Sequence, residues 1–311
     1  MERLTVVVPC YNEEEALPIF YNTIVEVAKQ LPDLDFEFLF VNDGSKDKTL
    51  EIMRELHKKD QRVRYVSFSR NFGKEAGILA GLKSASGDMV TLMDVDLQDP
   101  PSLLPQMVAL MKEKKVHHVA TRRATRKGEP VLRSFFARLF YKFINKISKT
   151  EIVDGARDYR LMSRAMVDAI LSLSEVNRFS KGIFGWVGFE TEWISFDNVE
   201  RSAGVTKWSF WSLLMYSLDG ITAFSTAPLA IASFMGFLFC GVSFLAIIII
   251  ITRHFMGVES AFGWASMVVS LFFLGGIQLL CMGILGQYLS KTYLETKHRP
   301  VFIVEETEKD I

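Results

Sequence analysis

Residues 89–101 read MVTLMDVDLQDPP, an apolar run that leads directly into a cluster of acidic side chains. The run predicts a buried β-strand, and the two prolines end it. Asp94 and Asp96 are two positions apart, so on an extended chain their carboxylates point to the same side. With the amide of Gln98 they would form an oxygen-rich site that suits Mg²⁺ or Mn²⁺ and also holds a diphosphate. A solvated acidic turn is the alternative for an isolated D-x-D pattern.

Upstream of this stretch, apolar runs typical of β-strands alternate with segments whose apolar residues recur at helical spacing. The predicted strands are residues 4–8, 36–41, 63–68 and 89–93, and the predicted helices are 16–30, 48–59 and 73–85; further strands are expected at 116–120 and 192–196. This alternation predicts an α/β fold with a doubly wound, mostly parallel sheet. The loops after the first, second and fourth strands would then converge where such sheets bind ligands.

The overall composition excludes some classes of protein. The chain has 36 basic and 36 acidic residues, so no nucleic-acid-binding charge is visible in the total. Three widely spaced cysteines argue against both a zinc site and a disulfide framework. A hydrophobic content of 49% is high for a soluble protein and indicates membrane segments. The chain starts with a predicted strand, so we expect no cleavable signal peptide.

The second half of the chain carries the predicted membrane segments. Residues 225–252 and 262–289 contain no charged residue and are each long enough to cross a bilayer. Residues 130–148 have an apolar face opposite basic residues, which favours an interfacial helix over a core helix, and a juxtamembrane helix is expected at 209–220. Basic residues flank the spans on the side of the termini, which predicts that both termini and the catalytic domain are cytoplasmic. The tail, residues 290–311, contains a strand-like segment at 300–304 that would serve as an edge for self-association in a homo-oligomer.

Four short motifs occur in order along the first hundred residues. They are PCYNE at 9–13, VNDGS at 41–45, RNFGK at 70–74 and DVDLQD at 94–99. Together they resemble the signatures of family 2 glycosyltransferases with the GT-A fold, and the resemblance extends over residues 1–210. The nearest branch resembles the polyprenyl-phosphate glycosyltransferases, such as dolichol-phosphate mannose synthase and the bacterial bactoprenol glucosyltransferases. Asn42 is a departure, because many members carry Asp there, and Asp43 would then make the nucleotide contact alone.

The resemblance implies a nucleotide-sugar donor. Asp43 and Glu13 would accept hydrogen bonds from the base or the ribose, although a turn residue and an exposed loop acid are the structural alternatives. Tyr11 would lie against the base. The metal ligands would be Asp94, Asp96 and Gln98, and Asp96 also counts as catalytic because the metal supports the leaving diphosphate. The complete implied donor set is Pro9, Tyr11, Glu13, Asp43, Lys74, Asp94, Val95 and Gln98.

An acceptor segment is implied by residues 153–162, VDGARDYRLM, which resemble the family motif G-D-F-R-L-M. Asp158 matches the motif aspartate and is the candidate base, with Asp154 as the rival. Arg160 would pair with a lipid phosphate or hold the loop, and an Asp–Arg structural pair is the alternative. The basic loop 121–128 would clamp phosphate through Arg122, unless it is a solvated charge run. Lys207, in the element that precedes the membrane part, would also reach a phosphate.

The sequence thus predicts a membrane-anchored, metal-dependent, inverting GT-A glycosyltransferase of the cytoplasmic membrane. It would transfer a hexose from a nucleotide-sugar, with UDP-glucose favoured, to polyprenyl phosphate. A GDP-mannose-dependent enzyme of the dolichol-phosphate-mannose type and an aminosugar transferase remain open, as does a non-catalytic nucleotide-binding scaffold. The sugar, the nucleotide, the metal preference and the oligomeric state are not fixed by the sequence.

Overall fold

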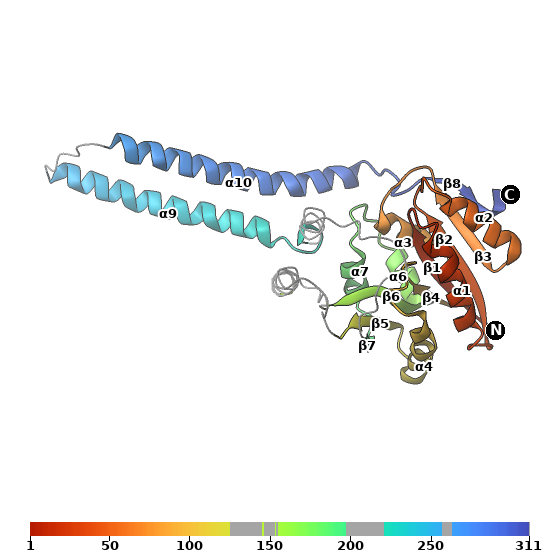
Figure 1. Ribbon diagram of the computed structural model, residues 1–311. Coiled ribbons are helices and arrows are strands. Elements are labelled where there is room, and N and C mark those ends of the chain that lie inside the picture. The colour runs from red at the N-terminus through yellow and green to blue at the C-terminus, as the bar shows by residue number, and fades with distance from the viewer. Residues whose placement is uncertain (125–144, 146–152, 154, 197–220, 257–262, 311) are drawn as a thin grey trace.

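The computed structural model describes residues 1–124, 145, 153, 155–196, 221–256 and 263–310 (Figure 1). The strands are β1 (Glu2–Cys10), β2 (Leu34–Asn42), β3 (Val63–Phe68), β4 (Met89–Leu92), β5 (His118–Arg123), β6 (Ala156–Ser163), β7 (Thr191–Phe196) and β8 (Val304–Thr307). The helices are α1 (Ala16–Ala28), α2 (Thr49–Lys59), α3 (Lys74–Ser84), α4 (Leu104–Lys114), α6 (Arg164–Leu171), α7 (Ser180–Trp186), α9 (Ala227–Phe255) and α10 (Trp264–Thr296), with 3₁₀ turns η1 (Pro101–Leu103) and η2 (Glu308–Asp310).

The described strands form one mixed sheet in the order β7-β5-β6-β4-β1-β2-β3-β8. Strands β4, β1, β2 and β3 are parallel neighbours, and β5 pairs with β7 in parallel. Strand β6 lies antiparallel between β4 and β5, and β8 closes the other edge antiparallel to β3. The predicted α/β class with a mostly parallel sheet is confirmed. The position of β6 beside β4 places the acceptor-like segment next to the acidic stretch.

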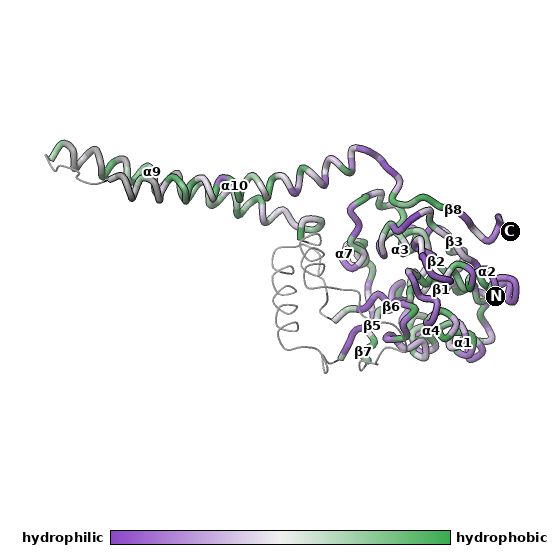
Figure 2. Tube along the Cα trace, turned by 45° about the horizontal axis from the view of Figure 1, so that its top comes forward, coloured by the Kyte–Doolittle hydropathy of each residue, from purple (hydrophilic) through white to green (hydrophobic). Residues whose placement is uncertain are grey.

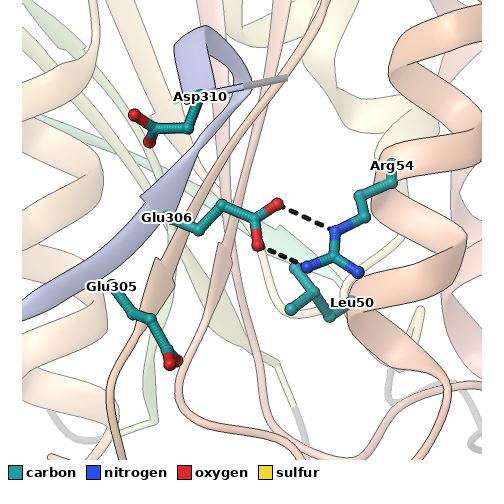
Figure 3. A pocket seen from close by; sticks show the side chains of 5 residues that line it. All are labelled: Leu50, Arg54, Glu305, Glu306 and Asp310. Atoms are coloured by element: carbon teal, nitrogen blue, oxygen red, sulfur yellow. Dashed lines mark hydrogen bonds and ion pairs between the residues drawn. The ribbon is translucent and has the colours of Figure 1, made fainter.

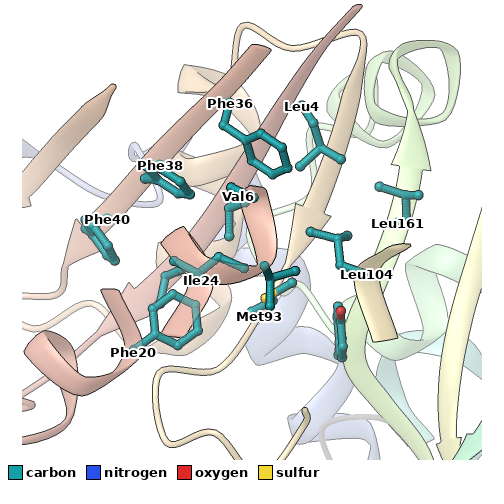
Figure 4. Packing of buried hydrophobic residues seen from close by; sticks show 14 of the residues in the cluster. Leu4, Val6, Phe20, Ile24, Phe36, Phe38, Phe40, Met93, Leu104 and Leu161 are labelled. Atoms are coloured by element: carbon teal, nitrogen blue, oxygen red, sulfur yellow. The ribbon is translucent and has the colours of Figure 1, made fainter. Parts of the chain in front are cut away.

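Helices cover both faces of the sheet, because side chains of each strand alternate between the two faces. Helices α1, α2 and α4 pack on one face around a core that includes Phe20, Phe38 and Tyr159 (Figure 4). Helices α3, α6 and α7 pack on the other face, where Val7, Leu39 and Met162 point. Residues 158, 160 and 162 of β6 share one parity, so they lie on the α3–α7 face.

Two predicted strands differ from the structure. The strand predicted at 116–120 is β5, which runs two to three residues later and includes Arg122 and Arg123. The strand-like tail segment predicted at 300–304 is β8 at Val304–Thr307, and it pairs with β3 of the same chain. The reason is the same in both cases: pairing with neighbouring strands, rather than local hydrophobicity, sets the bounds of these short strands.

The tail is attached to the sheet by ion pairs and a ring contact. Arg54 of α2 makes a two-pronged ion pair with Glu306 of β8 (Figure 3). Tyr65 also donates to Glu306 at 2.7 Å, and Arg64 pairs with Glu308 at the same distance. The ring of Phe302 stacks on Phe68 with centroids 4.9 Å apart. The chain therefore returns from its last helix to complete the sheet.

Helices α9 and α10 lie side by side and extend away from the sheet (Figure 1). Both are long and apolar enough to cross a membrane over Ala227–Ala246 and Ser270–Thr296, by length and composition, and the side chains of these spans are not buried in the protein. In Figure 2, hydrophobic residues (green) recur along both of their traces. The predicted spans at 225–252 and 262–289 overlap these helices. The helices predicted at 130–148 and 209–220 lie outside the described residues, apart from Asn145.

Candidate active site

The loops after β1 and β2 are joined by hydrogen bonds. The amide of Asn12 donates to Ser45 Oγ at 2.9 Å, and the Asn12 side chain accepts from the Lys46 amide at 2.8 Å. The amide of Glu13 donates to Thr49 Oγ1 at 2.8 Å. Asn12 has a left-handed φ of 54°, which Asn tolerates better than most residues. These bonds hold the loop after β1, which carries Tyr11 and Glu13, against the loop after β2, which carries Asp43. Pro9 lies just before the first of these loops, near the end of β1.

Asp43 shapes the loop before α3. Its Oδ1 accepts from the Phe72 amide at 2.6 Å and its Oδ2 from the Gly73 amide at 2.9 Å. Burial raises the pKa of Asp43, although both amide donors lower it. Gly44 has φ +63° and its position leaves no room for a side chain, since an added Cβ would lie 2.3 Å from the backbone of Arg70. A nucleotide contact from Asp43 stays a prediction, and each carboxylate oxygen keeps a lone pair for it.

Asn42 has a structural role in this loop. The residue is buried, its Nδ2 donates to Ser67 Oγ at 2.8 Å, and its Oδ1 accepts from the Ser45 amide at 3.1 Å. The side chain thereby ties the end of β2 to the end of β3. An Asn fits this position because its side-chain amide donates one hydrogen bond and accepts another, which an ionised Asp would not do.

The acidic stretch is a turn rather than an extended strand end. Strand β4 stops at Leu92, a turn follows at Val95 and Asp96, and Leu97 has a left-handed φ of 56°. The amide of Gln98 donates to Asp96 Oδ1 at 3.1 Å. The expectation that Asp94 and Asp96 share one side of an extended chain is therefore wrong, because the chain turns between them. Asp94, Asp96 and Gln98 are nevertheless all partly exposed around this turn, while Val95 is buried.

Lys74 connects the acidic turn to the acceptor-like segment. It is the first residue of α3, and its Nζ lies 2.7 Å from Asp94 Oδ1 and 2.6 Å from Asp158 Oδ2. The Lys74 side chain is 39% exposed, against 26% for Asp94 and 17% for Asp158. One ammonium group thus bridges the ends of β4 and the start of β6. The sequence placed Lys74 in the donor set but gave no sign of this bridge.

The charges around Asp158 determine its ionisation. Burial raises the pKa of Asp158, but the charges of Lys74, Lys181 and Arg160 and the Lys74 hydrogen bond outweigh it and hold that pKa well below its ordinary value. Burial lowers the pKa of Lys74, and the two carboxylates raise it above the usual range. Asp158 is therefore a carboxylate at neutral pH and Lys74 an ammonium.

The donor types at the acidic turn are those that divalent cations prefer. Two carboxylates and an amide oxygen are hard ligands, and Mg²⁺ in such sites takes its remaining ligands from phosphate and water. Among the described residues, no three or more His, Cys, Asp or Glu side chains gather as a metal cluster, and Asp94 is paired with Lys74. Metal binding by Asp94, Asp96 and Gln98 stays a prediction.

A buried ion pair anchors the end of the acidic stretch. Arg157 Nε donates to Asp99 Oδ1 at 2.6 Å, and the Asp99 side chain is fully buried. Burial raises the pKa of Asp99 to about 6, although Arg157 lowers it. Arg157 therefore ties the start of β6 to the end of the acidic stretch.

The predicted acceptor residues have different environments. Arg160 is buried, its Nη2 donates to the Arg157 carbonyl at 2.6 Å, and its guanidinium lies 3.7 Å from the Phe184 ring centroid. This favours the loop-holding alternative for Arg160. Arg122 is in β5, not in a loop as predicted, and its Nε donates to Ser195 Oγ at 3.0 Å. Asp154 and Lys207 lie outside the described residues, as does the basic loop after residue 124.

Glu75 is a site residue that the sequence did not reveal. It follows Lys74 on α3, and its Oε2 accepts from the amide and the hydroxyl of Ser180 on α7. Burial raises the pKa of Glu75. Nothing in the RNFGK motif or its surroundings points to this contact, since α7 lies about a hundred residues further along. Helix α7 is thus fixed to the helix that carries Lys74.

The fold and the cluster define an α/β enzyme that gathers acidic groups at the carboxyl ends of its parallel strands. The chain belongs to glycosyl transferase family 2, whose model matches residues 5–171. It is therefore a glycosyltransferase, with the GT-A type of sheet.

Several relatives match nearly the whole chain. The putative glycosyltransferase CsbB of Bacillus subtilis (strain 168) is 40% identical over 97% of this chain and 91% of its own length. A bactoprenol glucosyl transferase of Shigella phage SfV is 42% identical over 97% of this chain and 98% of its own. Among solved structures, glucosyl-3-phosphoglycerate synthase of M. tuberculosis matches 71% of this chain and 78% of its own, with 20% identity and a TM-score of 0.43.

Proposed function

We propose that the chain transfers a hexose from a nucleotide-sugar to a polyprenyl phosphate at a membrane surface. The observation that carries this proposal is the Lys74 bridge between Asp94 and Asp158. It brings the acidic turn that suits a diphosphate and metal within reach of the carboxylate on the acceptor-like strand. A donor and an acceptor bound on the two sides of Lys74 would meet there.

The lipid nature of the acceptor is supported by two independent features. Helices α9 and α10 are long and apolar enough to hold the chain in a bilayer. Relatives with about 40% identity over nearly the full chain are named bactoprenol glucosyl transferases. An enzyme with one soluble and one membrane-buried substrate needs both a nucleotide-binding sheet and such an anchor.

The proposed reaction is a single inverting displacement at the anomeric carbon. A phosphate oxygen of the acceptor forms the new bond to that carbon, while the bond to the donor diphosphate breaks and its electron pair leaves with the nucleoside diphosphate. A divalent ion held by Asp94, Asp96 and Gln98 would neutralise charge on the leaving diphosphate. Lys74 would place a further positive charge beside that group.

Asp158 would position the acceptor more than deprotonate it. The pKa of Asp158 is held low, so the residue is a weak base. A phosphate monoester is already ionised near neutral pH and needs little help to become a nucleophile. Asp158 would instead orient the attacking phosphate and complete the removal of any remaining proton.

UDP-glucose is the favoured donor, with Mg²⁺ or Mn²⁺ as the ion. The alternatives are GDP-mannose and an aminosugar nucleotide, because a few hydroxyl contacts decide between hexoses. The test is to incubate membranes that contain the full chain with a panel of radiolabelled nucleotide-sugars and to identify the glycolipid. Labelled glucosyl-phosphoryl-polyprenol supports the proposal, and label only in water-soluble products contradicts it.

The proposed location is the cytoplasmic membrane, with the sheet and both termini in the cytoplasm. The basic residues near the two helices on the side of the termini motivate this topology. A cysteine introduced at exposed Lys46 should resist a membrane-impermeant thiol reagent in intact cells and react after lysis. Labelling in intact cells would contradict the proposed topology, because it would place this loop outside the cytoplasm.

A further inference from the structure

Helix α7 faces the strand that carries Asp158. Phe184 of α7 lies under the guanidinium of Arg160, at 3.7 Å from ring centroid to carbon. Asp158 and Arg160 are two positions apart on β6, so both side chains lie on this same face. Lys181 is three residues before Phe184 and shares its face of α7, one turn toward the N-terminus. Lys181 therefore lies on the side of α7 that faces β6, and its charge helps to lower the pKa of Asp158.

Contacts on both sides of Lys181 fix its position. Ser180 is held by Glu75, the neighbour of Lys74 on α3. Gly182 lies directly against Phe224, since an added Cβ would be 2.4 Å from that ring. Phe224 precedes α9 by only three residues. Lys181 is thus flanked by one residue bonded to α3 and one residue packed just before α9.

The Lys181 side chain is half-buried. Among the residues that the structure describes, no side chain or backbone group forms a hydrogen bond or ion pair with its amino group. Lys74, in contrast, is shared between Asp94 and Asp158. Lys181 is therefore a second positive charge near Asp158, besides Lys74, that a negatively charged substrate group would contact. Such a cation would offset the repulsion between an anionic substrate and the Asp158 carboxylate.

We propose that Lys181 binds the phosphate monoester of the acceptor lipid and holds it against Asp158. This inference rests on the proposed function for the identity of the lipid. The ligand chemistry, a phosphate group, could also come from the donor diphosphate. The acceptor is favoured because the neighbour of Lys181, Gly182, packs against Phe224 just before the apolar helix α9, where a membrane-held lipid would approach.

The test uses the purified full chain in detergent, with the variants Lys181→Gln and Lys181→Arg. The control is Lys112→Gln, because Lys112 lies on α4, on the opposite face of the sheet from α7, and pairs with Glu2 of β1. Steady-state kinetics give separate KM values for polyprenyl phosphate and for the nucleotide-sugar. A second measurement, the binding of farnesyl phosphate and of farnesol, requires no transfer. Folding of each variant is checked by its melting temperature.

Lys181→Gln should raise the acceptor KM and weaken farnesyl phosphate binding about 10- to 100-fold, as expected for one hydrogen bond to a charged group. The donor KM and farnesol binding should not change, and Lys181→Arg should recover most of the loss. A rise in the donor KM alone, or no change in either KM, overturns the inference.

If the wild-type chain binds farnesyl phosphate through Lys181 but transfers no sugar to a prenyl phosphate, the proposed function fails and the phosphate site stands. A wild-type chain that neither binds nor glycosylates a prenyl phosphate overturns both.

Discussion

The Nζ of Lys74 lies 2.6 Å from Oδ2 of Asp158, a contact between residues 84 positions apart in the chain. The same ammonium touches Asp94, so the first residue of α3 joins the acidic turn to β6. Without Lys74, two carboxylates would face each other across the site. We therefore infer that the positive charge of Lys74 keeps Asp94 and Asp158 close together in the candidate active site.

Replacement of Lys74 by Gln should lower kcat about 10- to 100-fold, because the substitution removes hydrogen bonds to two charged groups. Lys83→Gln is a matched control, since Lys83 lies in the last turn of the same helix, over the ring of Phe302. Steady-state transfer assays on both variants give the comparison. Equal activity of Lys74→Gln and wild type would remove Lys74 from the site.

Asp158→Asn should slow turnover more than it changes the affinity for the donor. The substitution keeps the shape of the side chain but removes the charge that we assign to positioning the acceptor. Separate measurements of kcat and of nucleotide-sugar binding by calorimetry distinguish the two effects. A variant with normal kcat and weakened donor binding would reassign Asp158 to the donor site.

Asp99→Ala should destabilise the protein by about 3–5 kcal/mol, because it leaves the charge of Arg157 without its buried partner. The melting temperature of the detergent-solubilised chain measures this. Asp168→Ala is the control: Asp168 is exposed and lies 3.9 Å from Arg164, so its loss should change stability by less than about 0.5 kcal/mol. Similar melting temperatures for the two variants would mean that the Asp99–Arg157 pair does not hold the turn.

The attachment of β8 should weaken at low pH. The Arg54 hydrogen bonds lower the pKa of Glu306 from its ordinary 4.5, and burial only partly opposes them. A carboxylate with a lowered folded pKa stabilises the fold above pH 4.5 and loses that contribution as the pH falls below 4.5. The protection factors of the β8 amides, which compare each observed exchange rate with the intrinsic rate at the same pH, should therefore fall below that pH.

At pH 7, Glu306→Gln should accelerate exchange in β8 about 10- to 100-fold, since it removes a charged partner of Arg54 and Tyr65. The exposed neighbour Glu305 provides the control, and Glu305→Gln should exchange like wild type. If both variants exchange at the wild-type rate, the ion pair does not hold the tail.

The sequence predicted the parts of the fold that depend on local pattern. The strand at 63–68 is correct to the residue, and the α/β alternation up to β4 follows from runs of apolar residues. The sequence could not predict that β6 inserts antiparallel between β4 and β5, or that β8 returns to β3. These pairings depend on partners far along the chain, such as Arg54 for Glu306.

The sequence predicted which motifs belong to the candidate site, but not how their side chains are arranged in space. Asp94 and Asp158 were both singled out, yet the link between them is a lysine whose partners only the tertiary structure reveals. The turn at Val95 and Asp96 was missed because alternation along a strand says nothing about where the strand ends. Lys181 carries no motif of its own, and its importance comes from the packing of Phe184 against Arg160.

The proposed reaction is metal-dependent transfer of a sugar to a prenyl phosphate at the turn that carries Asp96. Its most direct test is to incubate the full chain with labelled UDP-glucose, polyprenyl phosphate and Mn²⁺ or Mg²⁺, and to count label in the extracted lipid. We expect labelled lipid with wild type, and none with Asp96→Ala or when a chelator removes the ion. Undiminished lipid labelling by Asp96→Ala, or equal labelling of polyprenol without its phosphate, would contradict it.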